Sequence, residues 1–392
     1  MSEKVRVGII GIGNMGGGHI NNYVAGKMPE IEITCVADID EKKFENAKEK
    51  IPGVVCFNTA TDLINSGLCD AVLIATPHYF HPPIAIEALK AGLHVMSEKP
   101  AGVYTKQVRE LIDFAKTTDK TYAIMFNQRT NCTYRAVKDM VSSGKYGEIK
   151  RVSWIITDWF RTQQYYNSGG WRATWEGEGG GVMLNQCPHQ LDLWQWICGM
   201  PSKVSAICHE GKWHDIEVED DVSIYVEYPN GATGTFITTT GDCPGTNRLE
   251  ITLDKAKIIV EYDRMEERYK VLLCELSDST DNFIKNSEKG FAKIEEKWSE
   301  VETDGKNEQH VGVMNAFAAH ILRGEPLIAQ GAEGINGLTI SNAAFLSSWL
   351  GRPVELPIDE DLYYNMLQDK IKNSKYVKTV NEATEKDMSG TY

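Results

Sequence analysis

The sequence predicts an α/β protein of two domains, in which a parallel sheet with helices on both faces is followed by a mostly antiparallel sheet. Two patterns predict this arrangement. Apolar runs alternate with helical segments up to residue 127, and longer strands of alternating polarity begin after residue 128. The length of 392 residues suits two domains, since one domain usually holds about 100 to 200 residues.

The first region repeats a strand followed by a helix. Its strand-like runs are apolar along their whole length rather than at every second residue, which is typical of parallel strands buried on both faces. The first helical pattern follows Gly16. The expected strands cover residues 5–11, 31–38, 70–77, 93–100 and 121–127, and the other expected helices cover residues 41–50, 81–92 and 105–117.

The second region carries longer alternating strands, EIKRVSWIITDWF (148–160) and DVSIYVEYPNGATGTFITTT (221–240). The second of these contains Asn230-Gly231, a dipeptide that favours a hairpin turn, so antiparallel pairing is expected. A polar, solvated excursion is expected at 275–308, followed by helices at 314–324 and 337–351. The domains are therefore expected at residues 1–127 and 128–375, with a polar tail at 376–392.

Composition excludes several classes of partner. No apolar run approaches the roughly 18 residues needed to cross a bilayer, so no membrane association is expected. The formal net charge of −14 would repel a phosphate backbone, so nucleic acid is not an expected partner. Nine cysteines without a C-x-x-C pair indicate reduced thiols, and the start MSEKVRVGIIG shows no export signal. A cytoplasmic location is therefore expected.

The turn between the first strand and the first helix has the spacing G-x-G-x-x-G at Gly11, Gly13 and Gly16. Asp38 ends the next strand, 22 residues past Gly16, which completes the dinucleotide-binding pattern. The second glycine would let backbone N–H groups approach a pyrophosphate, and Asp38 would accept hydrogen bonds from the ribose hydroxyls. Asp38 would also repel a 2′-phosphate, and the neighbouring Asp40 and Glu41 add no basic partner. NAD is therefore favoured over NADP.

Five further motifs occur in this order: ATPHYFH (75–81), AIEALKAGLHVMSEKP (85–100), FNQR (126–129), GEGGGVMLNQCPHQLDL (177–193) and EGINGLTISNAAFLSSWLGRPVELP (333–357). With them the sequence resembles the Gfo/Idh/MocA family of sugar and cyclitol dehydrogenases over nearly its whole length. The resemblance implies a Rossmann domain, then an open-faced, mostly antiparallel sheet, with the active site between them. It also implies that Lys99 and His189 carry the chemistry. Two positions depart from the family pattern, because Asn185 stands where Asp is common and His78 where Asn is common.

The two implied catalytic residues suit alcohol oxidation. A histidine such as His189 can take a hydroxyl proton near neutral pH, and the Lys99 ammonium can hydrogen-bond the reacting oxygen. Asp192, one helical turn past His189, is interpreted as structural. The residues expected to bind the cofactor are Gly11, Gly13, Asn14, Met15, Gly16, Asp38, Thr76, Pro77, His78, His81, Glu98, Lys99 and Asn127. The residues expected to bind the substrate are Lys99, Asp158, Trp171, Arg172, Asn185 and His189.

An aromatic loop at 159–177 suits a sugar, because rings can stack on its C–H faces and polar groups can bind its hydroxyls. The same aromatic residues would equally suit a subunit interface or the core of the loop itself. The predicted activity is NAD-dependent oxidation of a secondary ring hydroxyl of a sugar or glycoside, with C3 favoured. Two alternatives remain, an NAD-recycling glycosidase and a non-catalytic NAD-binding regulator. The run HEGKWHD (209–215) has two histidines, but no metal site is expected. The open sheet predicts a homo-oligomer, either a dimer or a tetramer.

Overall fold

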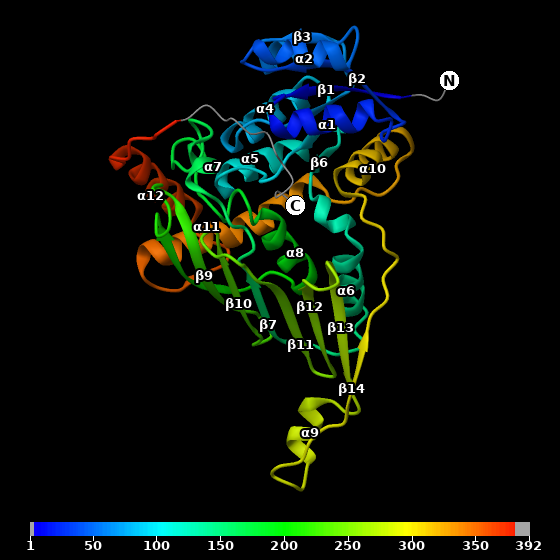
Figure 1. Ribbon diagram of the computed structural model, residues 1–392, viewed down its shortest axis with the longest axis vertical. Helices are drawn as coiled ribbons and strands as arrows, with labels where there is room; N and C mark the ends of the chain where they lie inside the picture. Colours follow the sequence, from blue (N-terminus) through cyan, green and yellow to red (C-terminus); the bar gives the residue numbers. More distant parts are fainter. Residues whose placement is uncertain (1–3, 381–392) are drawn as a thin grey trace.

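The computed structural model describes residues 4–380 and contains two sheets (Figure 1). The first has six strands in the order β3-β2-β1-β4-β5-β6, and every pair in it is parallel, as the uniformly apolar runs predict. Its strands are β1 (Val5–Ile10), β2 (Ile31–Ala37), β3 (Val55–Phe57), β4 (Ala71–Ile74), β5 (His94–Ser97) and β6 (Tyr122–Ile124). Its helices are α1 (Asn14–Val24), α2 (Lys42–Lys50), α3 (Ala60–Ile64), α4 (His81–Lys90) and α5 (Thr105–Ala115), with short 3₁₀ turns η1 (His78–Phe80) and η2 (Asn127–Thr130).

The second sheet has nine strands in the order β14-β13-β12-β11-β7-β10-β9-β8-β15. The central pair, β7 and β10, is parallel, and the other pairs are antiparallel, including the β9–β10 hairpin that Asn230-Gly231 predicts. Its strands are β7 (Ile149–Ile156), β8 (Lys203–Glu210), β9 (Glu219–Glu227), β10 (Thr233–Thr239), β11 (Asn247–Leu253), β12 (Ala256–Asp263), β13 (Arg268–Leu276), β14 (Glu296–Glu300) and β15 (Val354–Glu355).

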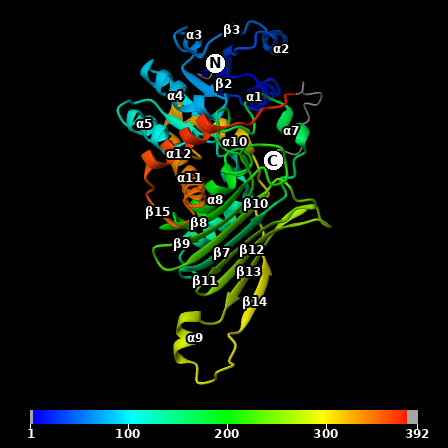
Figure 2. The ribbon, with the colours of Figure 1, turned by 90° about the vertical axis from the view of Figure 1, so that its left-hand side faces the viewer.

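Helices cover one face of the second sheet, where α8 and α11 pack against each other and α11 lies along β8 (Figure 2). The core there is built from residues such as Trp154, Trp194 and Phe345, which are all buried. The other face carries exposed apolar side chains, as described below. The helices of this region are α6 (Cys132–Ser142), α7 (Gln163–Asn167), α8 (Pro188–Cys198), α9 (Thr280–Asn286), α10 (Gln309–Arg323), α11 (Gly334–Leu350) and α12 (Glu360–Asn373), with a 3₁₀ turn η3 (Gly331–Glu333).

Two segments differ from their sequence-based expectation. The excursion expected at 275–308 is partly regular, because β14 pairs with β13 and α9 lies on an arm that extends from the sheet (Figure 1). Helix α10 packs into the core of the first domain rather than the second, through Val313, Met314 and Phe317. Of the polar tail expected from residue 376, only residues 376–380 lie within the described part of the chain.

Candidate active site

The turn between β1 and α1 uses its three glycines in two ways. At Gly11 φ is +88°, and a Cβ there would lie 2.6 Å from the carbonyl oxygen of Ala75. A Cβ on Gly16 would lie 2.0 Å from the carbonyl oxygen of Gly11, so both positions require glycine for packing. A Cβ on Gly13 would meet nothing within 4 Å. The turn is therefore open at Gly13, where a pyrophosphate would approach the start of α1.

Asp38 lies just past the end of β2 and is nearly buried. Its carboxylate accepts hydrogen bonds from the backbone N–H groups of Ile12 and Asp40, both at 2.9 Å. The Lys43 ammonium lies 3.0 Å from each of its two oxygens. Asp40 and Glu41 supply no basic partner to Asp38, but the first turn of α2 brings back to it Lys43, a residue that sequence reasoning missed.

Three residues expected to bind the cofactor carry a buried polar atom without a hydrogen-bond partner among residues 4–380. The atoms are Thr76 Oγ1, Glu98 Oε2 and Asn127 Oδ1. They follow β4, β5 and β6, at the carboxyl edge where open parallel sheets bind ligands. Leaving a buried polar group unpaired costs about 1–3 kcal/mol, so a bound ligand rich in hydroxyl and amide groups would stabilise this edge. The residues present therefore fit a dinucleotide.

His81 connects two of the segments that form this edge. Its Nδ1 lies 2.8 Å from the Pro100 carbonyl oxygen and its Nε2 lies 2.7 Å from the Thr76 carbonyl oxygen. The buried ring thus links the chain after β4 to the chain after β5, and positions Thr76 through its backbone. The other expected cofactor residues flank the same edge, Pro77 and His78 beside Thr76, and Asn14 and Met15 in the first turn of α1.

Glu98 forms a buried ion pair with His19 of α1, with 2.8 Å between Oε1 and Nε2. His310 of α10 meets the His19 ring edge to face, with 5.5 Å between ring centres. Burial raises the pKa of Glu98, but the hydrogen bond and charge of His19, together with the charges of His310 and Lys99, lower it by more, so its pKa lies below its ordinary value. Glu98 is thus a carboxylate that anchors α1 beside Lys99.

Lys99 reaches from the first domain into the second. Its ammonium donates a hydrogen bond to the backbone carbonyl of Asn185, at 3.0 Å. Burial is the main cause that lowers the pKa of Lys99 below its ordinary value, while the charge of Glu98 opposes the shift and that of Arg172 adds to it. The two domains therefore meet at this ammonium group.

His189 occupies the first turn of α8, where Phe126 packs edge to face against its ring at 6.4 Å. Burial holds the pKa of His189 well below its ordinary value, and the charges of Lys99 and His310 lower it further. The ring is therefore neutral at neutral pH and can accept a proton. Lys99 and His189, predicted as a pair from sequence, lie within electrostatic range of each other.

Asn185 is held between an acid and a phenol. Its Nδ2 donates to Glu178, and its Oδ1 accepts a hydrogen bond from the Tyr165 hydroxyl at 3.2 Å. Arg172 donates to the same hydroxyl at 2.8 Å. Burial is the main cause that raises the pKa of Glu178, and the charge of Arg172 offsets part of this effect. The acidic group that Asn185 itself lacks is therefore supplied next to it by Glu178.

The sequence matches two family descriptions that together cover more than half of the chain. Residues 5–126 match "Oxidoreductase family, NAD-binding Rossmann fold", and residues 134–259 match "GFO/IDH/MocA C-terminal domain". The chain belongs to the Gfo/Idh/MocA family. Its first domain is an NAD-binding Rossmann domain, as the turn at Gly11 predicts.

Two curated relatives show the range of the Gfo/Idh/MocA proteins that this chain resembles. An inositol 2-dehydrogenase of Corynebacterium glutamicum is 26% identical over 243 residues, which cover 59% of this chain and 66% of that enzyme. A D-glucoside 3-dehydrogenase of Escherichia coli is 26% identical over 247 residues, which cover 59% of this chain and 68% of that enzyme. The matched segment therefore spans just under two thirds of the inositol dehydrogenase.

Among solved structures, the WlbA dehydrogenase of Chromobacterium violaceum, in complex with NADH and UDP-GlcNAcA, has a TM-score of 0.77 and 27% identity. The match covers 92% of this chain and 98% of WlbA. A levoglucosan dehydrogenase, in complex with NADH and levoglucosan, has a TM-score of 0.75 at 20% identity, with 91% of this chain and 100% of that chain covered. The second likeness shows that the two chains share the same fold.

The other expected substrate residues of this Gfo/Idh/MocA chain differ in their placement. Trp171 meets His78 edge to face at 5.5 Å between ring centres, and His78 Nδ1 lies 3.3 Å from the Glu178 carbonyl oxygen. The cation of Arg172 lies over the Tyr165 ring at 4.7 Å. These contacts connect the aromatic loop to the cluster around Asn185. Asp158, in contrast, lies exposed just past the end of β7.

Sequence reasoning missed several residues of the site. Glu178 lies inside the motif GEGGG, where an acidic residue flanked by glycines is the sequence signal that could have identified it. His19 and His310 had no such signal, because they are far apart in sequence and meet only in the fold. Asp192, interpreted as structural, forms a buried ion pair with Arg129 at 2.7 Å.

Neither a metal centre nor a membrane span is found in the part of the chain that the structure describes. No group of three or more His, Cys, Asp or Glu side chains within residues 4–380 is arranged to hold a metal ion. None of the helices in that range is long and apolar enough to cross a bilayer. The two histidines of HEGKWHD pair with separate carboxylates, His209 with Asp221 and His214 with Asp220.

Proposed function

We propose that this chain is an NAD-dependent dehydrogenase that oxidises a secondary ring hydroxyl of a sugar or glycoside, with C3 as the favoured position. One observation carries the proposal. A half-buried ammonium, Lys99, and a buried neutral imidazole, His189, lie together where the carboxyl edge of the Rossmann sheet meets the second domain.

These two side chains divide the work on the hydroxyl. His189 takes up the hydroxyl proton, since its pKa is held low and its ring is neutral. Lys99 donates a hydrogen bond to the same oxygen and stabilises negative charge that develops on it. Glu178 and Asn185 hold the backbone that Lys99 contacts. Bound NAD would accept the hydride, held by the open turn at Gly13, by Asp38 and by the unpaired polar atoms after β4, β5 and β6.

The sugar class is supported by the aromatic loop and by the relatives. Trp171 and Tyr165 present rings beside the cationic Arg172, a combination that binds the C–H faces and hydroxyls of a pyranose. The curated relatives named above act, by their names, on inositol and on D-glucosides. Both substrates carry secondary hydroxyl groups on a ring. A ring hydroxyl is therefore the substrate group proposed here.

A substrate panel tests this function. Glucosides, free hexoses, inositols and 2-hydroxy acids are incubated with NAD, NADH formation is followed, and the products are characterised by mass spectrometry and NMR. We expect the loss of two hydrogens and a new ring ketone. Turnover restricted to hydroxy acids would refute the proposal. Release of an aglycone without net NADH would instead support the NAD-recycling glycosidase.

We also propose that the open face of the nine-stranded sheet forms a homo-oligomer, a dimer or a tetramer. Ile155, Ile207, Tyr225 and Ile237 are exposed on the adjacent strands β7, β8, β9 and β10. In the strand register Ile237 lies opposite Ile155, which makes the apolar surface continuous between these two strands. Light scattering tests this by comparing Ile237→Arg, which should lower the oligomer mass, with the control Ile284→Arg on α9, outside the open face, which should not. A wild-type monomer would refute it.

A further inference from the structure

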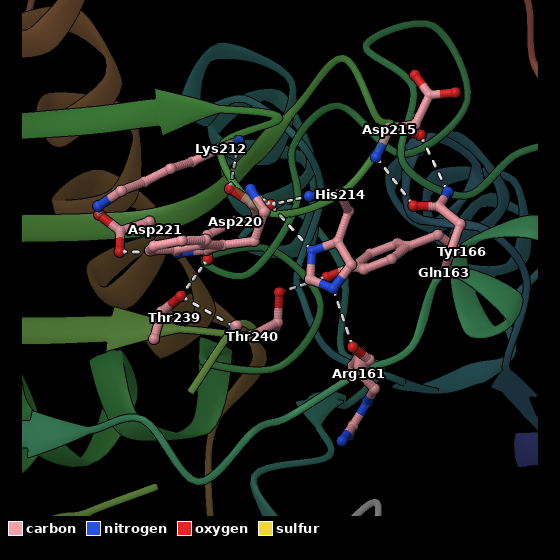
Figure 3. Close-up of polar contacts among 12 residues, drawn as sticks. Arg161, Gln163, Tyr166, Lys212, His214, Asp215, Asp220, Asp221, Thr239 and Thr240 are labelled. Carbon is pink, nitrogen blue, oxygen red and sulfur yellow. Dashed lines mark hydrogen bonds and ion pairs between the residues drawn. The ribbon is translucent and has the colours of Figure 1, made fainter. Parts of the chain in front are cut away.

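The aromatic loop at 159–177 has little regular structure of its own. Its one helix, α7, spans five residues, yet the loop carries Tyr165, Trp171 and Arg172 of the proposed sugar site. Such a loop needs external contacts to hold its side chains in one geometry, because an irregular segment otherwise loses that geometry easily. The contacts come from the HEGKWHD run, which begins in the last two residues of β8 and continues into the turn after it (Figure 3).

His214 is the link between the two segments. Its Nδ1 lies 2.9 Å from Asp220 Oδ2, and its Nε2 lies 2.9 Å from the backbone carbonyl oxygen of Arg161, at the start of the loop (Figure 3). A carboxylate and a carbonyl both accept hydrogen bonds, so the ring satisfies both only when both of its nitrogens carry protons. His214 therefore acts here as a cation.

Asp220 is well prepared to hold that cation. Its buried carboxylate also accepts hydrogen bonds from three successive backbone N–H groups, those of Lys212, Trp213 and His214, at 2.9–3.0 Å. The turn that carries His214 is thus folded around one carboxylate of β9. Because β9 belongs to the rigid sheet, the imidazole that it holds is a fixed point for the loop.

Two further contacts connect the same segments. Gln163 exchanges hydrogen bonds with the backbone of Asp215, at 2.9 and 3.1 Å, and the Tyr166 hydroxyl hydrogen-bonds to Thr240 at 2.7 Å (Figure 3). The ring of Tyr166 packs against that of His214, with 4.8 Å between centres. Tyr165, the residue before Tyr166 in α7, contacts Asn185 and Arg172 of the site. Tyr166, which packs against His214, and Tyr165, which contacts the sugar site, are therefore adjacent in the chain.

We propose that His214 is a positioning residue for the sugar: its ring bridges Asp220 and the Arg161 carbonyl, and so fixes the loop that presents Tyr165 and Arg172. This inference rests on the proposed function for the identity of the ligand. The bridge itself is a property of the protein alone, and it can be measured without a substrate.

His209 provides a matched control a few residues away. Its Nδ1 lies 2.9 Å from Asp221 Oδ1, the same distance as in the His214–Asp220 pair. The His209 side chain is 50% exposed, however, against 8% for His214, and its pair joins β8 to β9 without a contact to the loop. A variant of His214 therefore removes a His–Asp pair together with the contact to the loop, whereas a variant of His209 removes only a His–Asp pair.

The bridge should depend on pH. Burial lowers the pKa of His214, but the hydrogen bonds to Asp220 and to the Arg161 carbonyl raise it by more, so its pKa lies above its ordinary value. The titratable groups packed against the ring are Asp220 of β9 and Tyr166 of α7; Lys212 and Asp221 pair with each other farther out. The Arg161 guanidinium points away from the ring in Figure 3. The bridge is therefore complete below the raised pKa and loses one of its two hydrogen bonds as pH rises through it.

The first experiment compares His214→Gln with His209→Gln, because glutamine keeps a donor but cannot become a cation. For His214→Gln we expect the sugar KM to rise about tenfold at pH 6.5, with kcat changed less than about threefold, since the catalytic groups are untouched. His209→Gln should match the wild type. The wild-type sugar KM should rise with pH towards the His214→Gln value, which itself stays nearly flat. Equal KM values and parallel pH profiles in all three proteins would overturn the proposal.

The second experiment needs neither substrate nor a stable variant. NMR of the wild type should show both ring N–H protons of His214 at pH 6.5, and hydrogen exchange in the loop should accelerate as they are lost. If no sugar is oxidised, the proposed function fails, but the NMR and hydrogen-exchange measurements still test whether His214 bridges Asp220 and the Arg161 carbonyl. A singly protonated ring throughout pH 6–8, or loop exchange that does not follow its titration, would overturn the proposal.

Discussion

The cofactor side and the sugar side of the site are positioned by different kinds of contact. On the cofactor side, the contacts come from turns that directly follow β1, β2, β4, β5 and β6, so each group is placed by the strand before it. On the sugar side, the loop at 159–177 is placed by side chains outside it, such as His214, which contacts the Arg161 carbonyl, and Asn185, which accepts a hydrogen bond from Tyr165. The cofactor side depends on local sequence and the sugar side on long-range contacts. A substitution on the cofactor side should therefore affect cofactor binding alone. A substitution on the sugar side should also displace other side chains of the loop.

The largest expected effect lies where the two sides meet. Lys99→Ala and His189→Ala should each lower kcat by roughly 10² or more, the scale of a lost acid–base group, and change NAD affinity by only a small factor. Steady-state kinetics with the oxidised sugar and a fluorescence titration with NAD measure the two quantities. Lys293→Ala, in the exposed segment before β14, is the control. Near-normal turnover in either variant would give that residue a structural role.

The glycines of the first turn separate binding from folding within one motif. Gly13→Ala should weaken NAD binding about tenfold or more and leave the melting temperature unchanged, because its Cβ enters open space that the pyrophosphate needs. Gly16→Ala should destabilise the fold by at least about 1–3 kcal/mol, because its Cβ meets the Gly11 carbonyl oxygen.

Gly17→Ala is the matched control, since its Cβ also meets nothing and alanine favours a helix by up to about 1 kcal/mol. Calorimetry of NAD binding and thermal unfolding of the three variants complete the test. Unchanged NAD affinity in Gly13→Ala would place the pyrophosphate elsewhere.

Asp38 and Lys43 test how cofactor choice is set. Asp38→Ala should lower NAD affinity about tenfold and raise NADP affinity, because it removes the ribose acceptor and leaves the Lys43 ammonium to meet a 2′-phosphate. The double variant with Lys43→Ala should lose the gain in NADP affinity. Competitive titrations of both cofactors measure this. A preference for NADP in the wild type would contradict the role given to Asp38.

The smallest effect is expected at Asn185, on the sugar side. Asn185→Asp should fold, but it places a second carboxyl group against Glu178, whose pKa burial already raises. A raised pKa in the folded state adds stability at acidic pH that is lost as pH rises through it, so the melting temperature of the variant should fall more steeply than that of the wild type between pH 5 and 8. Parallel melting profiles would mean that the two groups do not interact.

The comparison also explains what the sequence could predict. The parallel sheet, the turn at Gly11 and the Asp38 position follow from apolar periodicity and spacing, which are local properties. The family motifs identified Lys99 and His189, which the fold then brings together. Lys43 was missed because only the turn of α2 returns it to Asp38. His19 and His214 were missed because Glu98 and the Arg161 carbonyl, which they contact, are distant in sequence, and pairing at such distances leaves no periodic signal. Glu178 was missed although Asn185 is only seven residues away, because the contact between them forms only once the chain has folded.

The packing of α10 affects the order in which the protein can be completed during synthesis. Val313, Met314 and Phe317 of α10 belong to the same buried core as Val7 and Ile33 of the first sheet. A ribosome therefore releases all six parallel strands before it has made the helix that covers part of their core. In the interval the nascent Rossmann domain exposes an apolar surface, while nearly two hundred further residues are translated. The domain that is synthesised first is among the last to be finished, and a fragment cut after residue 127 would retain that exposed surface permanently.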